Sequence, residues 1–347
     1  KKENQIPAHR LFDPKVKGNE KNIEEATNLI ANAKKPIFYI GGGCINSGPK
    51  AASLVTNFVE EIGAPATMTL MGLGVLPASN EFSLGMLGMH GMYEANMAMH
   101  ECDVMVNIGA RFDDRVTGRL DAFSPNSKKI HIDIDASSIN KNIKVDIPIV
   151  GDVESIMNQF KDVWKKNKFS TNKDALKAWW KKIEEWKKIK CLDFEQKDEI
   201  IKPQQAVKRL YELTKDKNTI ITTEVGQHQM WAAQHYVFKD PQTWVSSGGS
   251  GAMGYEVPGA MGAKVGAPSK TVWSIAGDGG FQMTMAELAT MVENKINVKF
   301  AIINNSVLGM VRQWQEFFYE KSYVATQYTR NPDFVKLAEA FGMLGLR

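Results

Sequence analysis

Hydrophobic residues in the first half of this chain occur in short runs that alternate with segments of helical spacing. The apolar runs cover residues 36–40, 66–70, 103–108, 129–134 and 146–150. The helical patterns cover residues 22–35, 48–62 and 153–165. Short, continuous and β-branched apolar runs are typical of strands that are covered on both faces. Their alternation with helices predicts a parallel sheet in an α/β fold.

The second half repeats this alternation. Its apolar runs cover residues 219–223, 243–246, 271–276 and 297–303. Between the last two, residues 281–293 have helical spacing, which puts one apolar face on Met285, Leu288, Ala289 and Val292. We therefore predict a second α/β domain that begins at Pro203, a residue type favoured in the first turn of a helix.

The fold class that we predict is α/β, with two doubly wound parallel-sheet domains. A chain of 347 residues exceeds a comfortable single core, so two domains are expected. The boundaries that follow from the pattern are a lead-in over 1–21, a first domain over 22–169, a basic helical linker over 170–202 and a second domain over 203–347.

Charge adds little to this picture. The formal net charge is only +4, and much of the excess comes from a lysine-rich stretch at 161–190. A nucleic-acid patch is one reading of that stretch. The interleaved Trp179, Trp180 and Trp186 favour instead a helix that packs onto a domain and exposes its lysines. No apolar run reaches about 18 residues, so we expect no membrane span.

The cysteines and the first residues bear on location. Cys44, Cys102 and Cys191 are far apart, which fits reduced, mostly buried thiols better than disulfides or a zinc site. The chain opens Lys1-Lys2-Glu3 without a methionine or a signal-like segment, so we interpret it as an interior fragment. We expect a cytoplasmic location and leave an organellar one open.

The most informative motif connects the last two predicted strands. Gly277-Asp278-Gly279 follows one strand, and Asn304-Asn305 follows the next. Since parallel strands joined by a helix end at the same sheet edge, Asp278 and Asn305 should lie together there. A carboxylate and an amide oxygen suit Mg²⁺, which completes its shell with water and phosphate oxygens. The motif therefore predicts a magnesium-held diphosphate, although a lone Gly-Asp-Gly is usually only a turn.

This arrangement resembles the signature of enzymes that use thiamine diphosphate (ThDP). The run from Leu308 to Gln315 closely resembles a segment of the catalytic large subunit of acetohydroxyacid synthase, also called acetolactate synthase. The run from Gly109 to Gly118 resembles a second hallmark of that family. The resemblance covers essentially the whole chain. It implies a first domain that binds FAD and a second that binds ThDP and Mg²⁺.

The resemblance also implies the residues of the ThDP site. The turn Glu224 to His228 lies between a strand and a helix, where N–H groups and the helix dipole favour phosphate. A glycine-rich loop at 248–254 can admit the flat aminopyrimidine, and the main-chain carbonyl of Val307 would be a third magnesium ligand. The ThDP contacts implied are Val225, Gly226, Gln227, His228, Gly251, Met253, Gly277, Gly279, Met283 and Met310. A helix-cap histidine remains an alternative for His228.

The residues alone give weaker support for a nucleotide site in the first domain. Glycines follow the strand at 36–40, but Gly-x-Gly-x-x-Gly is not matched, and Asp133 could be an ordinary turn residue. Cys44 after Gly43 also departs from the pattern more usual in relatives. The resemblance favours FAD, and the matching positions are Gly41, Gly42, Gly43, Met89, His90, Gly109, Arg111, Asp113, Arg115, Val116, Asp133, Asp152 and Val153.

The activity implied is that of a transferase. Pyruvate is decarboxylated, and the two-carbon unit passes to pyruvate or 2-ketobutyrate, giving 2-acetolactate or 2-aceto-2-hydroxybutyrate in valine, leucine and isoleucine synthesis. Arg115 would hold the acceptor carboxylate, Trp314 would form an apolar wall, and Met283 would prop ThDP into its bent form. A competing interpretation is that Met283 is simply a core residue. Likewise, Trp314, Phe317 and Phe318 could form the core-facing side of an amphipathic helix.

One catalytic group is expected elsewhere. In the family, the glutamate that protonates the aminopyrimidine belongs to an N-terminal domain, so we expect this chain alone to be inactive. The resemblance further implies a homodimer or homotetramer with the site between subunits, a small regulatory subunit, and no nucleic-acid or membrane partner.

Other functions share parts of this pattern. Pyruvate oxidase, glyoxylate carboligase and catabolic acetolactate synthase share the magnesium motif; the Arg111–Arg115 and Met310–Trp314 runs argue against them. A non-catalytic nucleotide-binding module is an alternative of another class, but it gives Asp278 and Asn305 no joint role.

Overall fold

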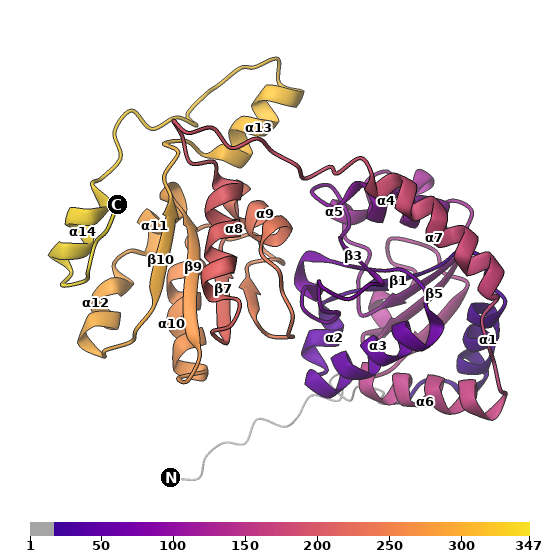
Figure 1. The fold of residues 1–347 in the computed structure, drawn as a ribbon. Helices are drawn as coiled ribbons and strands as arrows, with labels where there is room; N and C mark the ends of the chain where they lie inside the picture. The colour runs from indigo at the N-terminus through magenta and orange to yellow at the C-terminus, as the bar shows by residue number, and fades with distance from the viewer. Residues whose placement is uncertain (1–16) are drawn as a thin grey trace, which may run out of the picture. The chain divides into compact units, whose positions relative to one another are not determined.

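The computed structural model describes residues 17–347, and most of the predicted lead-in at 1–21 lies outside them. The chain forms two compact units (Figure 1). The first comprises the described residues up to Leu76 together with Asn80–Cys191. The second comprises Pro77–Ser79 and Leu192–Arg347. Each unit is an α/β structure around a parallel sheet, so the predicted fold class is confirmed.

The first unit has a six-stranded sheet in the order β3-β2-β1-β4-β5-β6, with every neighbouring pair parallel. Along the chain, β2 and β3 are added on one side of β1, and β4, β5 and β6 are then added on the other side. The space between β1 and β4 is therefore the switch point of the sheet. The strands are β1 Pro36–Ile40, β2 Ala66–Met68, β3 Ser83–Met86, β4 Val104–Ile108, β5 Lys128–Asp133 and β6 Ile147–Val150.

Helices cover this sheet in two groups (Figure 1). One group packs together as α1 Glu20–Ala31, α3 Pro49–Ile62 and α6 Val153–Lys166. The other pairs α4 Tyr93–Glu101 with α7 Lys173–Lys187, and the short α2 Gly42–Asn46 and α5 Asp114–Thr117 follow β1 and β4. Helix α3 illustrates the local signals: Pro49 starts it, and Gly63 ends it with a left-handed φ of 72°.

Helix α7 lies inside the segment expected to be a linker, and it packs against the first unit. Trp179 and Ile183 are buried in the same core as Tyr39 and Met99. The Trp179 indole Nε1 donates to the Pro36 carbonyl oxygen at 3.1 Å. Its lysines remain largely on the surface, so the apolar stripe of α7 belongs to the core.

The second unit has a four-stranded parallel sheet in the order β10-β9-β7-β8. Its switch point lies between β7 and β9. The strands are β7 Thr219–Thr223, β8 Trp244–Ser246, β9 Thr271–Gly277 and β10 Lys299–Ile303. The helices are α8 Pro203–Thr214, α9 Gln227–His235, α10 Glu256–Gly266, α11 Asp278–Thr284, α12 Glu287–Glu293, α13 Gly309–Phe318 and α14 Phe334–Ala340.

Several sequence expectations need correction here. The helix predicted at 281–293 is two helices, α11 and α12, with a break at Met285 and Ala286. This break resets the helical phase, so Leu288 and Met291 are buried, whereas Ala289 and Val292 are exposed. The Thr284 hydroxyl donates to the Gly254 carbonyl at 2.7 Å and anchors the chain just before the break.

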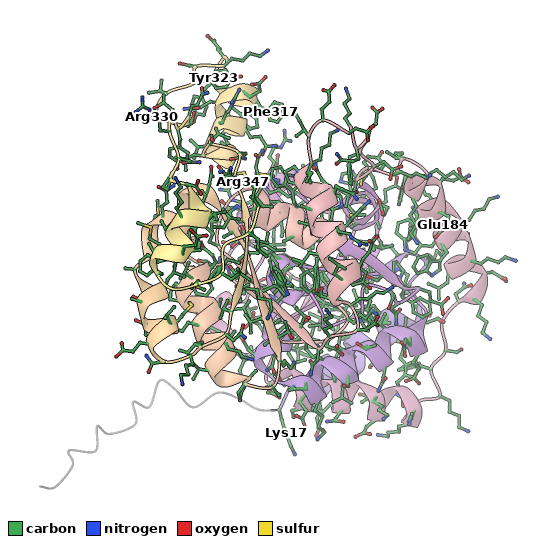
Figure 2. All side chains as sticks on the ribbon, turned by 60° about the vertical axis from the view of Figure 1, so that its left-hand side comes forward. Lys17, Glu184, Phe317, Tyr323, Arg330 and Arg347 are labelled. Atoms are coloured by element: carbon green, nitrogen blue, oxygen red, sulfur yellow. The ribbon has the colours of Figure 1, made fainter. Side chains whose placement is uncertain are left out.

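The alternative interpretation of α13, in which Trp314, Phe317 and Phe318 face the core, fails for the two phenylalanines. Phe317 and Phe318 are each 67% exposed, and Phe317 extends from the helix surface in Figure 2. Several elements were not predicted, among them β3, α2, α4, α10 and α14. Strand β3 alternates between half-buried and buried residues at the sheet edge and contains Gly85, so it lacks the continuous apolar run that identified the other strands.

The structure also bears on the expectations about membrane spans and cysteines. Within residues 17–347, no helix is long and apolar enough to cross a bilayer. The three cysteines are free thiols, but only Cys44 and Cys102 are buried, and Cys191 is exposed.

Replacing Trp179 by alanine tests whether α7 belongs to the core of the first unit. We expect a loss of about 3–5 kcal/mol in unfolding free energy, typical of deleting a buried large aromatic side chain. Chemical denaturation would measure it, with Lys177→Ala on the exposed face of α7 as the control. Equal, small effects of both changes would contradict the assignment.

Candidate functional site

The carboxyl ends of β7, β9 and β10 surround a cavity of about 130 Å³ in the second unit. This is the sheet edge, at a switch point, where α/β folds bind ligands. Many residues predicted for the ThDP and magnesium site line this cavity: Val225, Gly226, Gln227, His228, Met253, Gly277, Asp278, Gly279, Asn305, Val307 and Met310. The structure therefore brings together segments that are up to 85 residues apart in the sequence.

Asp278 is the most highly connected of these residues. It is the first residue of α11 and is only 2% exposed. Its Oδ1 accepts from the Gly279 N–H at 3.0 Å, and its Oδ2 accepts from the Ser306 N–H at 2.7 Å. The carboxylate thereby joins the end of β9 to the turn after β10, where Ser306 has a left-handed φ of 57°.

Asn331 completes this arrangement and was not found from the sequence. Its Nδ2 donates to Asp278 Oδ2 at 2.7 Å and to Asn304 Oδ1 at 2.8 Å. Asn305 instead turns its Oδ1 to the Val307 N–H at 3.2 Å. Asn331 lies in an irregular segment before α14, so neither helical nor strand periodicity marks it.

The oxygen atoms around this part of the cavity suit a magnesium ion. Asp278 offers a carboxylate, Asn305 an amide oxygen, and Val307 a main-chain carbonyl, and all three residues line the same space. These are hard donors of the kind Mg²⁺ prefers, and two or three of them leave room for water or phosphate oxygens. The donor set therefore fits the ion.

The start of α9 forms another wall. Gly226 precedes the helix, and a Cβ there would lie 2.8 Å from the His228 ring, so the turn needs glycine. Burial lowers the pKa of His228 to about 4, which makes the ring neutral at physiological pH. The Gln227 side chain lies against Gly309, where a Cβ would approach its Oε1 to 2.2 Å. The free N–H groups of this helix start favour an anion.

Glu224 is a wall residue that the sequence analysis did not single out as a site. It follows β7, lines the cavity and is 1% exposed. Its Oε2 accepts from the Gly254 N–H at 2.5 Å. Burial raises the pKa of Glu224 to about 7, although N–H groups of Gly254, Gly277 and Val225 favour its ionised form. The sequence feature that could have identified Glu224 is its position directly after a buried strand.

Three predicted residues of this unit do not line the cavity. Gly251 is exposed and has a left-handed φ of 67°. Met283 is 59% exposed, with its Cβ close to Gly254. Trp314 is half-buried, and its ring centroid lies 5.2 Å from that of Phe318. A role for these three remains a prediction.

In the first unit, glycines come into close contact at the switch point between β1 and β4. The Gly43 N–H donates to the Gly109 carbonyl at 2.9 Å, and a Cβ on Gly43 would lie 2.7 Å from the Gly109 Cα. A Cβ on Gly41 would approach the same carbonyl to 2.2 Å. Gly109 has a left-handed φ of 66°. The backbones can approach this closely only because side chains are missing there.

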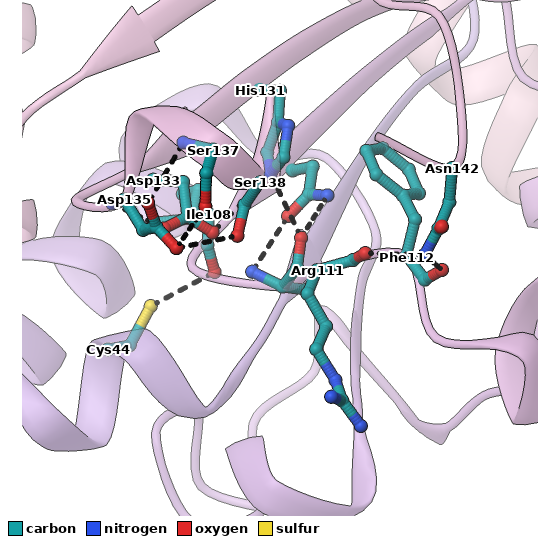
Figure 3. A network of polar contacts seen from close by, with 12 residues as sticks. Cys44, Ile108, Arg111, Phe112, His131, Asp133, Asp135, Ser137, Ser138 and Asn142 are labelled. Atoms are coloured by element: carbon teal, nitrogen blue, oxygen red, sulfur yellow. Dashed lines mark hydrogen bonds and ion pairs between the residues drawn. The ribbon is translucent and has the colours of Figure 1, made fainter. Parts of the chain in front are cut away.

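Polar side chains of β4 and β5 fix the residues that follow this turn (Figure 3). Asn107 donates to the Ala110 carbonyl at 2.7 Å and accepts from the Ala110 N–H at 3.0 Å. The buried His131 places its Nε2 3.0 Å from the same carbonyl. Arg111 thus follows a turn that side chains of β4 and β5 hold in place (Figure 3), and its guanidinium forms an ion pair with Asp113.

The other predicted FAD positions lie on loops that follow these strands. The Met89 N–H donates to the Arg115 carbonyl at 2.8 Å, and a Cβ on Gly88 would meet Val116. Burial, with a smaller effect of Arg115, lowers the pKa of His90. Asp133 ends β5, and Asp152 accepts from the Ser47 hydroxyl at 2.7 Å before α6 begins at Val153.

Burial disfavours ionisation of Asp113, but the Arg115 N–H, Asp114 and Arg111 together hold its pKa below the usual range. Gly42 starts α2 beside Met71. The predicted nucleotide residues therefore gather along the carboxyl edge of the first sheet, with glycines and one arginine–aspartate pair at its switch point.

Comparison with known proteins gives the class of this fold and site. Residues 23–160 match the central domain of thiamine pyrophosphate enzymes, and residues 224–347 match their C-terminal TPP-binding domain. The second match contains every residue that lines the cavity. The two units thus define two of the domains of a thiamine pyrophosphate enzyme.

Individual relatives narrow the class. The chain is 43% identical to the acetolactate synthase large subunit of Haemophilus influenzae over 338 residues, which are 97% of this chain and 58% of the relative. It is 41% identical to acetolactate synthase isozyme 3 large subunit of Escherichia coli over the same shares. It is 43% identical to acetolactate synthase of Mycobacterium leprae over 341 residues, 97% of this chain and 54% of the relative.

The chain belongs to the acetolactate synthase large-subunit family of thiamine pyrophosphate enzymes. It spans 58% of the length of the first of these relatives.

Gly280 provides a test of the packing behind the cavity. A Cβ at Gly280 would lie 1.6 Å from Glu224 Oε1, so Gly280→Ala should destabilise the fold by about 1–3 kcal/mol through overpacking. Gly262→Ala in α10 has open space around its Cβ and should stabilise by about 0.5–1 kcal/mol. Thermal unfolding of both variants would show the opposite signs; a shared sign would refute the close contact.

Proposed function

We propose that this chain supplies the ThDP- and magnesium-binding part of an acetolactate synthase, which decarboxylates pyruvate and transfers the two-carbon unit to a second 2-keto acid. The observation that carries the proposal is the cavity in the second unit. It joins a helix start suited to phosphate with three oxygen donors suited to Mg²⁺. The names of the relatives, acetolactate synthase large subunits, agree with this reaction.

The residues divide into groups by the chemistry they can perform. Asp278, Asn305 and the Val307 carbonyl would hold Mg²⁺ against the diphosphate. Val225 to His228, with Gly277 and Gly279, would surround the diphosphate, and the neutral His228 can donate a hydrogen bond without adding charge. Gly251, Met253, Met283 and Met310 would contact the rings of the cofactor.

ThDP, when bound, supplies a nucleophilic carbon and an electron sink for loss of CO₂. The chain itself would orient the reactants and exclude water around them. Arg115 would hold the carboxylate of the acceptor, for which a guanidinium is well shaped. Trp314 would give the acceptor an apolar wall; one extra methylene in such a pocket is worth about 1–3 kcal/mol, so the wall would favour 2-ketobutyrate over pyruvate.

FAD is the proposed ligand of the first unit. Its support is the close approach of Gly41, Gly43 and Gly109 at a switch point, where missing side chains would let a phosphate come close to the main chain. Asp133 could accept from a ribose hydroxyl. In this proposal the flavin takes no part in net redox chemistry, so the enzyme remains a transferase.

The proposed assembly follows the same relatives. Their name, large subunit, implies a small subunit beside them. We propose for this chain a homodimer or homotetramer, with a small regulatory partner and pyruvate or 2-ketobutyrate as substrates.

The magnesium proposal can be tested by calorimetry on the full-length protein that contains this chain. ThDP should bind only with Mg²⁺, and Asp278→Ala should weaken binding by about 100-fold or more, since loss of a second-shell group alone costs about 10–100-fold. Asp240→Ala, an exposed carboxylate of the same unit, is the control. Binding that is indifferent to Mg²⁺ and to Asp278 would favour a non-catalytic nucleotide module.

The flavin proposal has a matched pair of arginines. Arg111 and Arg119 each form an exposed ion pair with the aspartate two positions later, but only Arg111 follows the glycine turn. Arg111→Ala should weaken FAD binding by about 10- to 100-fold, the value of one or two hydrogen bonds to a charged group. Arg119→Ala should not. Flavin fluorescence titration would measure both, and equal affinities would count against this site.

A further inference from the structure

A group of buried polar side chains lies between the second sheet and α10, on the inner side of the cavity wall. Thr222 of β7 and Ser274 of β9 are register neighbours and are fully buried. Glu224 follows Thr222 by two residues, so it continues on the same face of the strand. Glu256 begins α10, which packs against both strands.

These four side chains hold polar atoms without protein partners. They are Thr222 Oγ1, Ser274 Oγ, Glu224 Oε1 and both carboxyl oxygens of Glu256, none of which makes a hydrogen bond; the His228 Nε2 lies 3.5 Å from Glu224 Oε1. Glu256 is 0% exposed and Glu224 is 1% exposed. Two ionised carboxylates in such an interior would each lose hydration and also repel each other. A shared proton removes both costs, as in other close carboxyl pairs.

Packing fixes the position of Glu224 in this group. Its Oε2 is held by the Gly254 N–H at 2.5 Å, and Gly277 and Gly280 leave space for its carboxyl only because they lack a Cβ. The side chain therefore cannot change its orientation without losing these contacts. Glu224 also lines the cavity, whereas Glu256 does not.

In the part of the chain that the structure describes, the elements that pack against α10 contain no lysine, arginine or histidine. The elements that pack against α10 are β7, β8, β9, α11 and α12. The three strands contain no titratable side chain. Asp278 on α11 and Glu287 and Glu293 on α12 are all acidic, as is Glu224 after β7. Within the described residues, no group of three histidine, cysteine or acidic side chains could hold a metal ion.

The electrostatics agree with this geometry. Burial, and then the charge of Glu224, raises the pKa of Glu256 to about 8. On the cavity side, the nearby His228 is neutral and adds no positive charge. At neutral pH the more basic carboxyl of the pair is thus Glu256.

We propose that Glu256 is a protonated carboxylic acid that shares its proton with Glu224, so that the cavity wall presents one negative charge rather than two. The Thr222 and Ser274 hydroxyls make no hydrogen bond, so the sharing would be between the two carboxyls alone. Glu256 is a positioning residue: it acts on a bound ligand through Glu224. The effect on an anionic diphosphate rests on the proposed function, whereas the shared proton does not.

Infrared spectroscopy of the protein without cofactor tests the proton directly. At pH 7 the wild type should show the carbonyl band of a protonated carboxylic acid, and Glu256→Gln should weaken it clearly, because Glu224 alone is then only partly protonated. Glu293→Gln, the same change at an exposed position on α12, should keep it. A wild-type spectrum without the band would overturn the proposal.

Stability as a function of pH gives an independent readout. The pKa of Glu256 is about 8 in the folded state and about 4.5 when unfolded, so between these values the native state binds more protons. The unfolding free energy should therefore fall as pH rises from 4.5 to 8, and then level off. Glu256→Gln should flatten this decline, and Glu293→Gln should leave it unchanged. An identical slope in all three proteins would argue against a proton on Glu256.

Cofactor affinity tests the functional consequence. In the full-length protein, affinity for ThDP with Mg²⁺ should fall by about tenfold between pH 7 and pH 9, because one unit above the pKa about a tenth of the pair stays protonated. Glu256→Gln should lose less, since its amide stays neutral. An equal loss in both proteins would reject the coupling. Absence of ThDP binding at every pH would reject the proposed function, while the infrared and stability results still decide the shared proton.

Discussion

The second unit depends on one carboxylate. Asp278 starts α11 and accepts hydrogen bonds from its own helix, from the turn after β10 and from Asn331. These bonds fix three segments that the sheet alone leaves free, because sheet hydrogen bonding ends at Gly277 and Ile303. Burial makes the arrangement strict: a carboxylate with 2% exposure must keep its partners or pay the cost of desolvation. Asp278 itself and the residues after β10 line the cavity.

In the first unit, glycines rather than a charged side chain allow the segments at the sheet edge to come together. At its switch point, Gly43 and Gly109 bring two backbones together, while Asn107 and His131 hold the Ala110 peptide from inside. Both units thus use the same sheet edge, but in different ways. One edge has a buried carboxylate that joins neighbouring segments, and the other has glycines whose main chains are in contact.

Regular features were predictable from the sequence, and irregular ones were not. Strand β7 was placed residue for residue, and α6 to within one residue, because apolar periodicity reports burial directly. The break between α11 and α12 and the exposure of Phe317 follow from tertiary contacts that periodicity does not contain. The motif named Asp278 and Asn305, but Asn331 and Glu256 required the fold, since nothing in their neighbours marks them.

The missing side chain of Gly280 has a consequence for how this protein can change over time. The space that a Cβ would take is filled by the Glu224 carboxyl. A larger residue at position 280 is therefore acceptable only after Glu224 has become smaller, and a return to glutamate requires glycine first. The two positions are 56 residues apart, but substitutions at one depend on the residue at the other, and this constrains the order in which they can occur. Comparing sequences at either position alone would hide that dependence.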